Sequence, residues 1–298
     1  MKPKNPSNDS KVQQTTGALK WSIATALSLA LLKVLAGFFT HSMAVLTSAL
    51  DSAMDAGVST VNLIAAKEAA KPPDEDHAYG HGKIESLAAL LQGLFISASG
   101  FFVVVESGKR LIFGSFLRNV STGMGVMVFS VLASWLLVWR LQVVARRTGS
   151  LILATERLHF TTDILTNGGV IMALFLVQVT GFVFWDLVLS LTIAFYIFKT
   201  SYRILRQAID ELLDRSLPPV SKEEIETLIR NFHPSVVGLH NFRSRRVGEQ
   251  IFLDFHIEIR GEDDFKRAHL MTESLIQRIR DRYPGADITV HFDPEGEI

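Results

Sequence analysis

The N-terminal part of the chain contains six apolar segments, each long enough to cross a lipid bilayer as a helix. A spanning helix needs about 20 consecutive, mostly apolar residues. The segments that meet this requirement are Leu19–Phe39, Ala44–Ala66, Ile84–Val105, Gly123–Leu141, Leu151–Thr180 and Trp185–Ile204. This series predicts an α-helical membrane bundle with six transmembrane helices.

The composition indicates that the bundle is not the whole protein. The chain has 298 residues, of which 48% are hydrophobic, with a mean hydropathy of +0.26 and a formal net charge of zero. This is too apolar for an ordinary soluble protein and too charged for one that lies wholly in a membrane. The balanced charge argues against nucleic acid as a partner. The absence of cysteine excludes disulfides, Fe–S clusters and thiolate zinc sites, so any metal must be held by His, Asp and Glu.

These features divide the sequence into four parts. Residues 1–16 are polar and predict a disordered cytoplasmic tail without a cleavable signal peptide. Residues 17–208 contain the six membrane helices. Residues 209–219 include the sequence SLPP and predict a linker, because X-Pro steps oppose the continuation of a helix. Residues 220–298 are expected to form a cytoplasmic metal-binding domain.

Helical and strand patterns follow one another in this last part. We expect helices from Ser221 to Phe232 and from Phe265 to Tyr283, and strands over Val236–Arg246, Gln250–Ile259 and Asp287–Phe292. In the second strand, apolar side chains alternate with polar ones, which is typical of a strand with one buried face. The order predicts a small αββαβ domain of the α+β class, similar to ferredoxin-like metallochaperones. Its core is modest, so we expect dimerisation or bound metal to support it.

The basic residues of the short loops predict the orientation of the bundle. Lys and Arg precede the first span, lie between the second and third and between the fourth and fifth, and follow the sixth. The opposite-side turns, with the sequences THSM and GFVFWD, carry none. The loop with Lys109, Arg110 and Arg118 is an exception. Because cytoplasmic loops are enriched in these residues, we expect both termini in the cytoplasm.

Two of the apolar segments carry ionisable side chains at membrane depth. Asp51 and Asp55 lie four residues apart in the second segment, and His159 and Asp163 have the same spacing in the fifth. This spacing places both members of each pair on one helix face. Such groups normally mark an ion or proton pathway, and three carboxylates with one imidazole suit a four-coordinate divalent metal. A polar contact between helices is the alternative.

The loop after the second segment, PPDEDHAYGHGK, contains a second set of possible ligands. Asp74, His77 and His81 are spaced by three and four residues, and Gly80 and Gly82 allow the chain to turn the imidazoles toward one point. Nitrogen and oxygen ligands of this kind suit Zn²⁺ or a similar ion. A hydrophilic loop with two solvent-exposed histidines is the alternative.

A third set lies in the C-terminal domain. His240 and His256 fall on the first and second expected strands, His269 at the start of the last helix, and His291 with Asp293 on the final strand. His256 is out of phase with the apolar residues of its strand and therefore faces away from the core. These histidines are either metal ligands or ordinary surface residues.

The pairing of D-x-x-x-D with H-x-x-x-D resembles the cation diffusion facilitator family. The segments DHAYGHGKIESLAALLQGLFISASG, LLDRSLP and ITVHFDP are similar to its bacterial YiiP/FieF-type transporters, and the resemblance covers nearly all of the chain after residue 17. It implies three sets of ligands: a transport site of Asp51, Asp55, His159 and Asp163, a loop site of Asp74, His77 and His81, and a binuclear cytoplasmic site of His240, His256, His269, His291 and Asp293.

The resemblance also implies proton-driven efflux of Zn²⁺ from the cytoplasm by a homodimer in the bacterial inner membrane. Metal binding to Asp and His ligands displaces protons, so the same residues can carry H⁺ one way and metal the other by alternating access. A His ligand favours Zn²⁺, Cd²⁺, Co²⁺ or Fe²⁺ over Mg²⁺ or Ca²⁺.

Two other classes of function remain open. An intramembrane metalloenzyme would need an open coordination position with a general base, usually from a motif such as H-E-x-x-H, which the sequence lacks. A membrane-bound metal sensor would account for the C-terminal histidines but would leave the acids of the membrane segments without a role.

Overall fold

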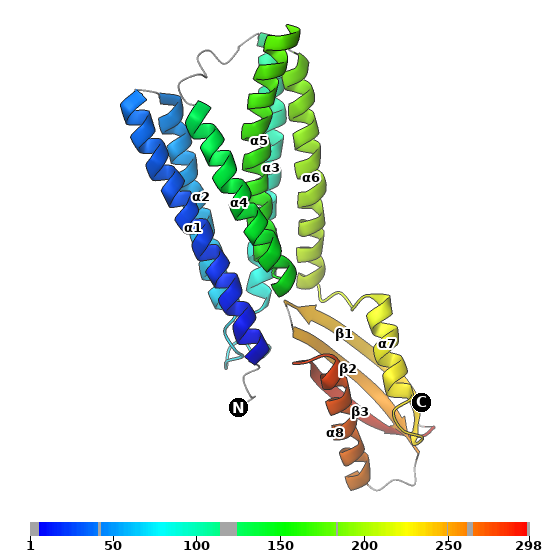
Figure 1. Ribbon diagram of the computed structural model, residues 1–298. Coiled ribbons are helices and arrows are strands. Elements are labelled where there is room, and N and C mark those ends of the chain that lie inside the picture. Colours follow the sequence, from blue (N-terminus) through cyan, green and yellow to red (C-terminus); the bar gives the residue numbers. More distant parts are fainter. Residues whose placement is uncertain are drawn as a thin grey trace. The chain divides into compact units, whose positions relative to one another are not determined.

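The computed structural model describes residues 6–40, 43–113, 124–182, 184–248, 250–260 and 265–296. The chain forms two compact units, Met1–Ile209 and Asp210–Ile298. The first unit is helical and the second is an α+β unit with a three-stranded sheet, which confirms the predicted fold class (Figure 1).

Each expected membrane segment lies in its own long helix, apart from Gly123 at the start of the fourth, which is outside the described residues. The six helices are α1 (Pro6–Thr40), α2 (Met43–Ala69), α3 (Lys83–Phe113), α4 (Met124–Thr148), α5 (Leu151–Thr180) and α6 (Phe184–Leu212). Four of them, among the described residues, contain stretches that are long and apolar enough to cross a membrane: Ser10–Phe39, Lys83–Val105, Val128–Thr148 and Leu187–Leu212. The remaining two, α2 and α5, are the helices that carry the acids and His159.

The helices extend further than the apolar pattern predicts. Helix α1 starts at Pro6, so residues 6–16 are helical where we expected a disordered tail, and residues 1–5 lie outside the described part. Extending an existing helix adds one hydrogen bond for each residue fixed, so polar residues continue it readily. For the same reason α3 continues past Val105 and includes Lys109, which we expected in a loop. Helix α6 likewise continues into the expected linker.

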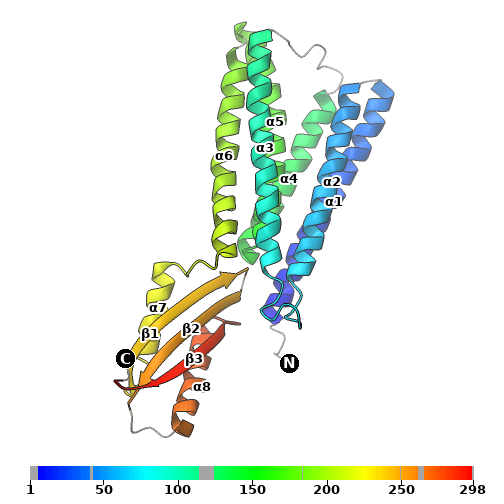
Figure 2. The same cartoon turned by 180° about the vertical axis from the view of Figure 1, so that it is seen from behind.

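Helix α5 is shared by the two apolar clusters that hold the bundle together. One cluster joins it to α1, α2 and α4 through buried residues such as Leu19, Leu141 and Phe160. The other joins it to α3 and α6 through residues such as Ile96, Leu158 and Ile197. In Figures 1 and 2, α1, α2 and α4 accordingly lie together, as do α3, α5 and α6. The side chains of α5 therefore face both groups of helices.

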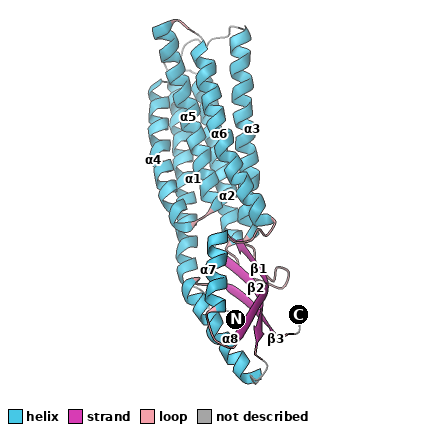
Figure 3. Ribbon diagram, turned by 90° about the vertical axis from the view of Figure 1, so that its right-hand side faces the viewer, coloured by secondary structure: helices cyan, strands magenta, loops and turns pink. Residues whose placement is uncertain are grey.

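The second unit has the predicted αββαβ order. Its elements are α7 (Pro219–Arg230), β1 (Val236–Val247), β2 (Gln250–Ile259), α8 (Phe265–Arg282) and β3 (Asp287–Pro294). Strand β2 lies in the centre of the sheet, antiparallel to β1 and parallel to β3 (Figure 3). The alternation expected in β2 is present, because the apolar residues of one face are buried in the core.

Both helices of this unit pack against one face of the sheet. Ile225 and Ile229 of α7 and Leu275 and Ile279 of α8 join the buried side chains of β2 in one core cluster. The opposite face of β2, which carries His256, is left outside this core.

Candidate metal sites

Three of the four predicted transport ligands lie together where α2 meets α5. The Nε2 atom of buried His159 is 3.0 Å from Oδ1 of Asp55 and 3.8 Å from Oδ2 of Asp163. Ligand atoms of these three residues all lie within 4.8 Å of one another. Asp55 comes from α2 and the other two come from successive turns of α5, so the group joins two helices that are far apart in the sequence.

Asp51 lies outside this group. It is on α2, one turn before Asp55, and its side chain is exposed. The structure therefore joins three of the four residues and leaves the role of the fourth as a prediction.

Sequence reasoning missed two buried charged residues beside this site. Lys33 is the buried one of the two lysines in the expected first span, and its Nζ donates to Oγ of Ser52 on α2 at 2.8 Å. Glu156 is fully buried on α5, one turn before His159, and accepts hydrogen bonds from Ser59 and from Asn62, the latter at 2.6 Å. Each could have been noticed as a charge inside an apolar segment.

The loop residues Asp74, His77 and His81 also form a compact group. One carboxylate oxygen of Asp74 is 3.4 Å from Nδ1 of His77, and the other is 3.4 Å from Nε2 of His81. Gly80 has φ +83, so the predicted role of a glycine in turning this loop is confirmed there. The backbone N–H of His77 donates to Asp74 and, with the nearby imidazoles, holds the pKa of that carboxyl below its usual range.

The sheet places three of the C-terminal histidines in one row. His240 of β1 pairs with His256 of β2, which in turn pairs with His291 of β3. Side chains in one row point to the same face, so the imidazoles are neighbours, with ring centroids 5.1 Å apart in the first pair and 4.6 Å apart in the second.

Asp293 links this row of histidines. Its Oδ2 is 2.9 Å from both His240 Nε2 and His256 Nδ1, and its Oδ1 is 2.9 Å from His291 Nδ1. The hydrogen bond with His256, followed by the charge of His291 and the hydrogen bond with His240, keeps the pKa of Asp293 below its usual range. An ionised carboxylate among imidazoles is a typical donor set for Zn²⁺.

His269 is not part of this group, and Glu258 is an addition to it. His269 is exposed on α8, and α8 packs against the core face of the sheet. Oε1 of Glu258 is 3.2 Å from Nδ1 of His240. Gly238 leaves room for this glutamate, because a Cβ there would lie 2.6 Å from Glu258 Cδ. The two-residue alternation from His256 could have identified Glu258 from sequence.

Each group contains a buried ligand atom without a hydrogen-bond partner among the described residues. These atoms are Oδ2 of Asp163, Nδ1 of His81 and Nδ1 of His240, the last of which lies 3.2 Å from Glu258 without hydrogen-bond geometry. A buried polar atom normally has a partner, and leaving one unpaired is costly. The donor sets and these unpaired atoms fit a bound divalent cation at each group.

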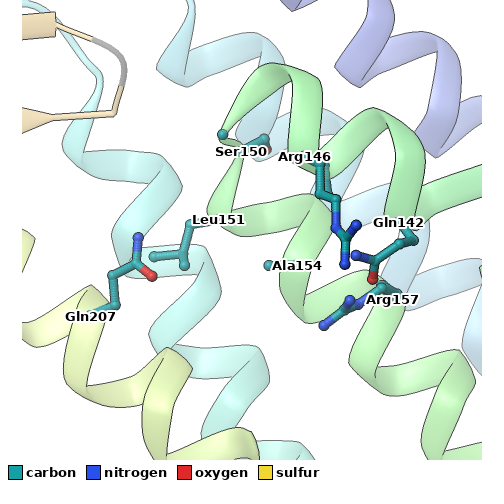
Figure 4. Close-up of a pocket in the computed structure, with 9 residues that line it drawn as sticks. Gln142, Arg146, Ser150, Leu151, Ala154, Arg157 and Gln207 are labelled. Carbon is teal, nitrogen blue, oxygen red and sulfur yellow. The ribbon is translucent and has the colours of Figure 1, made fainter.

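The structure also has a pocket that is lined by none of the predicted ligands. It has a volume of about 180 Å³ between α4, α5 and α6. Arg146 and Gln142 of α4, with Arg157 of α5, point toward one another on one side of it (Figure 4).

Comparison with known proteins identifies the family. Residues 19–213 match the model described as "Cation efflux transmembrane domain", and residues 217–295 match "Cation efflux protein, cytoplasmic domain". A cation-efflux pump FieF from Salmonella arizonae is 35% identical over 91% of this chain and 90% of its own length. The FieF pump of Serratia proteamaculans is 36% identical, with the same two shares.

A solved structure, the metal-bound C-terminal domain of the CzcD transporter from Thermotoga maritima, is 28% identical. It covers 28% of this chain and 99% of its own, with a TM-score of 0.25. The two family models together cover most of the sequence, and the FieF relatives align along nearly their whole length. The chain therefore belongs to the cation diffusion facilitator family of cation efflux transporters.

Proposed function

We propose that this protein exports a divalent cation, with Zn²⁺ as the main substrate, from the cytoplasm in exchange for protons. The observation that carries the proposal is the group of Asp55, His159 and Asp163 on two membrane helices. Ionisable residues at this depth are expensive, and they are normally found on ion pathways. The FieF relatives are named cation-efflux pumps, which supports the same direction of transport.

The donor atoms favour one class of cation. One imidazole with carboxylates suits Zn²⁺, Cd²⁺, Co²⁺ or Fe²⁺, whereas Mg²⁺ and Ca²⁺ prefer oxygen alone. We propose Asp51 as the fourth ligand, since it lies one turn before Asp55 on α2. It would complete a set of three carboxylates and one imidazole.

Exchange with protons follows from the chemistry of these ligands. A carboxylate or imidazole must be deprotonated to hold a metal, so metal binding releases protons and protonation releases the metal. Alternating access then requires that α2 and α5 expose the site first to one side of the membrane and then to the other.

The other two groups fit resident rather than transported metal. We propose that the sheet site of His240, His256, His291 and Asp293 binds Zn²⁺ and stabilises a homodimer. The family model that matches residues 217–295 carries the name ZT_dimer, which supports dimerisation. The loop site of Asp74, His77 and His81 binds a further ion. When bound, the metal supplies positive charge that offsets the carboxylates of these sites.

The proposed setting is the bacterial inner membrane, with lipid around the bundle and both termini in the cytoplasm. The basic residues of the loops support this orientation. The four helices with long apolar stretches support several crossings of the membrane.

Reconstituted vesicles test the proposal directly. Wild-type protein should move Zn²⁺ across the vesicle membrane together with an opposite flow of protons, and Asp55→Ala should abolish both flows. The variant Asp76→Ala is a matched control, because Asp76 is an exposed loop residue outside the three groups. Zinc binding without flux in the wild-type protein would favour a metal sensor, and zinc flux without proton flux would exclude the antiport.

A further inference from the structure

Lys33 is a buried lysine in the middle of an otherwise apolar stretch of α1. Its side chain is 7% exposed. The Nζ atom donates to Oγ of Ser52 at 2.8 Å and lies 3.3 Å from the backbone oxygen of Ser48. Both acceptors are neutral and belong to α2. A lysine at this depth is costly, so its retention needs a compensating interaction.

That interaction comes from the proposed transport site. Burial disfavours the charged form of Lys33, and the negative charges of Asp55, Asp163 and Asp51 oppose that effect by favouring the ammonium. Among the described residues, no carboxylate oxygen lies within 4.0 Å of its Nζ, so the ammonium forms no direct ion pair. Ser52, which lies between the two acids of α2 in the sequence, holds the ammonium beside the site without making it a ligand. Lys33 therefore acts on the site through its electric field.

We propose that Lys33 is the fixed counter-charge of the transport site. This inference rests on the proposed function, in which three carboxylates and a neutral imidazole bind one divalent cation. Such a site carries a net charge of minus one when loaded, and Lys33 brings the total to zero. A neutral group costs less to hold and to move within a low-dielectric bundle than a charged one does.

The same charge also limits how tightly the site holds its substrate. The ammonium repels the bound cation, and this repulsion is stronger in a protein interior than in water. Removing the charge should therefore tighten metal binding and slow metal release. If Lys33 only held α1 against α2, removing it would have the opposite effect on metal affinity. The site would become less ordered and would bind metal more weakly.

The experiment compares binding and turnover in the full-length reconstituted protein, with Zn²⁺ as the probe. In Lys33→Met, zinc should bind about tenfold more tightly, a change of about 1.4 kcal/mol, while the maximal transport rate falls about tenfold. Lys33→Gln should behave in the same way, and it provides the measurement if the Met variant does not fold. Lys33→Arg keeps the charge and should restore the wild-type balance of affinity and rate.

Two further variants separate charge from contact. Ser52→Ala removes the hydrogen-bond acceptor of Lys33 but keeps the ammonium charge. Its zinc affinity and transport rate should therefore resemble those of Lys33→Arg and not those of Lys33→Met. Lys20→Met is the matched control, since Lys20 is an exposed residue of the same helix about 20 Å from Lys33 along its axis.

Unchanged or weaker zinc binding in both Lys33→Met and Lys33→Gln would overturn the inference. Asp55→Ala, measured in parallel, tells this failure from a failure of the transport site. If Asp55→Ala abolishes binding while the Lys33 variants bind like the wild type, only the role of Lys33 is wrong. If Asp55→Ala binds and transports normally, the site itself is wrong.

Discussion

Replacing Glu156 with alanine should destabilise the membrane unit more than any replacement that keeps a hydrogen-bonding group there. The Glu156 side chain on α5 is fully buried, and its two carboxylate oxygens accept hydrogen bonds from Ser59 and Asn62 of α2. The amide of Gln92 on α3 lies 3.4 Å from the second oxygen. No described Lys, Arg or His forms an ion pair with it. This one carboxylate therefore links three helices.

The size of the effect follows from the donors that would lose their partner. A buried donor without an acceptor costs about 1–3 kcal/mol. The alanine variant leaves two donors in that state, the Ser59 hydroxyl and one N–H of Asn62, whose amide also donates to Gln92 at 3.0 Å. The free energy of unfolding should therefore fall by about 2–6 kcal/mol. In Glu156→Gln, the amide oxygen still accepts from Asn62, and the amide nitrogen can donate to the Ser59 hydroxyl oxygen. The free energy of unfolding of Glu156→Gln should therefore fall by only about 1–2 kcal/mol, since both hydrogen bonds remain and only the contribution of the negative charge to them disappears.

Thermal unfolding in detergent, followed by size-exclusion chromatography at a fixed heating time, measures these differences. For a folded unit of roughly 200 residues, each kcal/mol lowers the midpoint by roughly 2–4 °C. Glu156→Ala should therefore unfold at least about 4 °C below the wild type, and Glu156→Gln should lie between the two. Glu68→Ala is the matched control, because that glutamate of α2 is 41% exposed and pairs with exposed Lys71, an interaction worth about 0–1 kcal/mol.

Two results would refute this reasoning. A midpoint for Glu156→Ala as high as that of Glu68→Ala would mean that the carboxylate does not hold the three helices together. Equal midpoints for the alanine and glutamine variants would mean that the lost volume, and not the unpaired donors, causes the destabilisation.

Three further predictions concern the ligands and the second unit. His159→Asp should weaken zinc transport and favour harder ions such as Mn²⁺, because the site becomes all oxygen; vesicle uptake of both ions checks this, and an unchanged zinc preference would exclude His159 as a ligand. Replacing His240 and His256 with alanine together should abolish zinc binding by residues 210–298 in calorimetric titration, whereas absent binding in the wild-type unit would make these histidines surface residues. Arg282 and the Tyr283 hydroxyl donate to Glu224 and keep its pKa below the usual range, so this carboxylate contributes stability above the ordinary glutamate pKa of about 4.3 and loses it as pH falls through the lowered value. Glu224→Gln should thus lower the unfolding midpoint of this unit at pH 7, and a difference from the wild type that does not shrink in acid would contradict the assignment.

The sequence predicted the membrane helices because their apolar length is set by the thickness of the bilayer. It predicted the outward direction of His256 because side chains alternate strictly along a strand. It could not predict that Asp51 lies outside the group that includes Asp55. The spacing of two residues shows that they share a helix face, but it does not show where along that face the neighbouring helix makes contact. Four residues advance a helix by about 6 Å, so two acids on one face need not both reach His159.

The sequence likewise does not show that Lys33 and Glu156 lie beside the site. The candidate ligands of the membrane segments are pairs of ionisable residues spaced by four. Lys33 has no such partner in its apolar segment, and Glu156 lies three residues before His159. Their partners, Ser52 for the lysine and Asn62 for the glutamate, are ordinary polar residues of α2. Only the packing of α1 and α5 against α2 shows that both charges lie beside the site.

The sheet site depends on a β-bulge in β1, which the regular alternation of side chains along a strand does not predict. His240 and Ser244 are four residues apart in β1, so a regular strand would place both on the same face. In the structure His240 pairs with His256 on the outer face, whereas Ser244 is buried opposite Leu253 on the core face. One extra residue of β1 between His240 and Arg243 makes this possible, and Asn241, at φ +51, adopts the left-handed conformation that asparagine tolerates better than most residues. The β-bulge therefore lets one strand contribute both to the core and to the row of histidines.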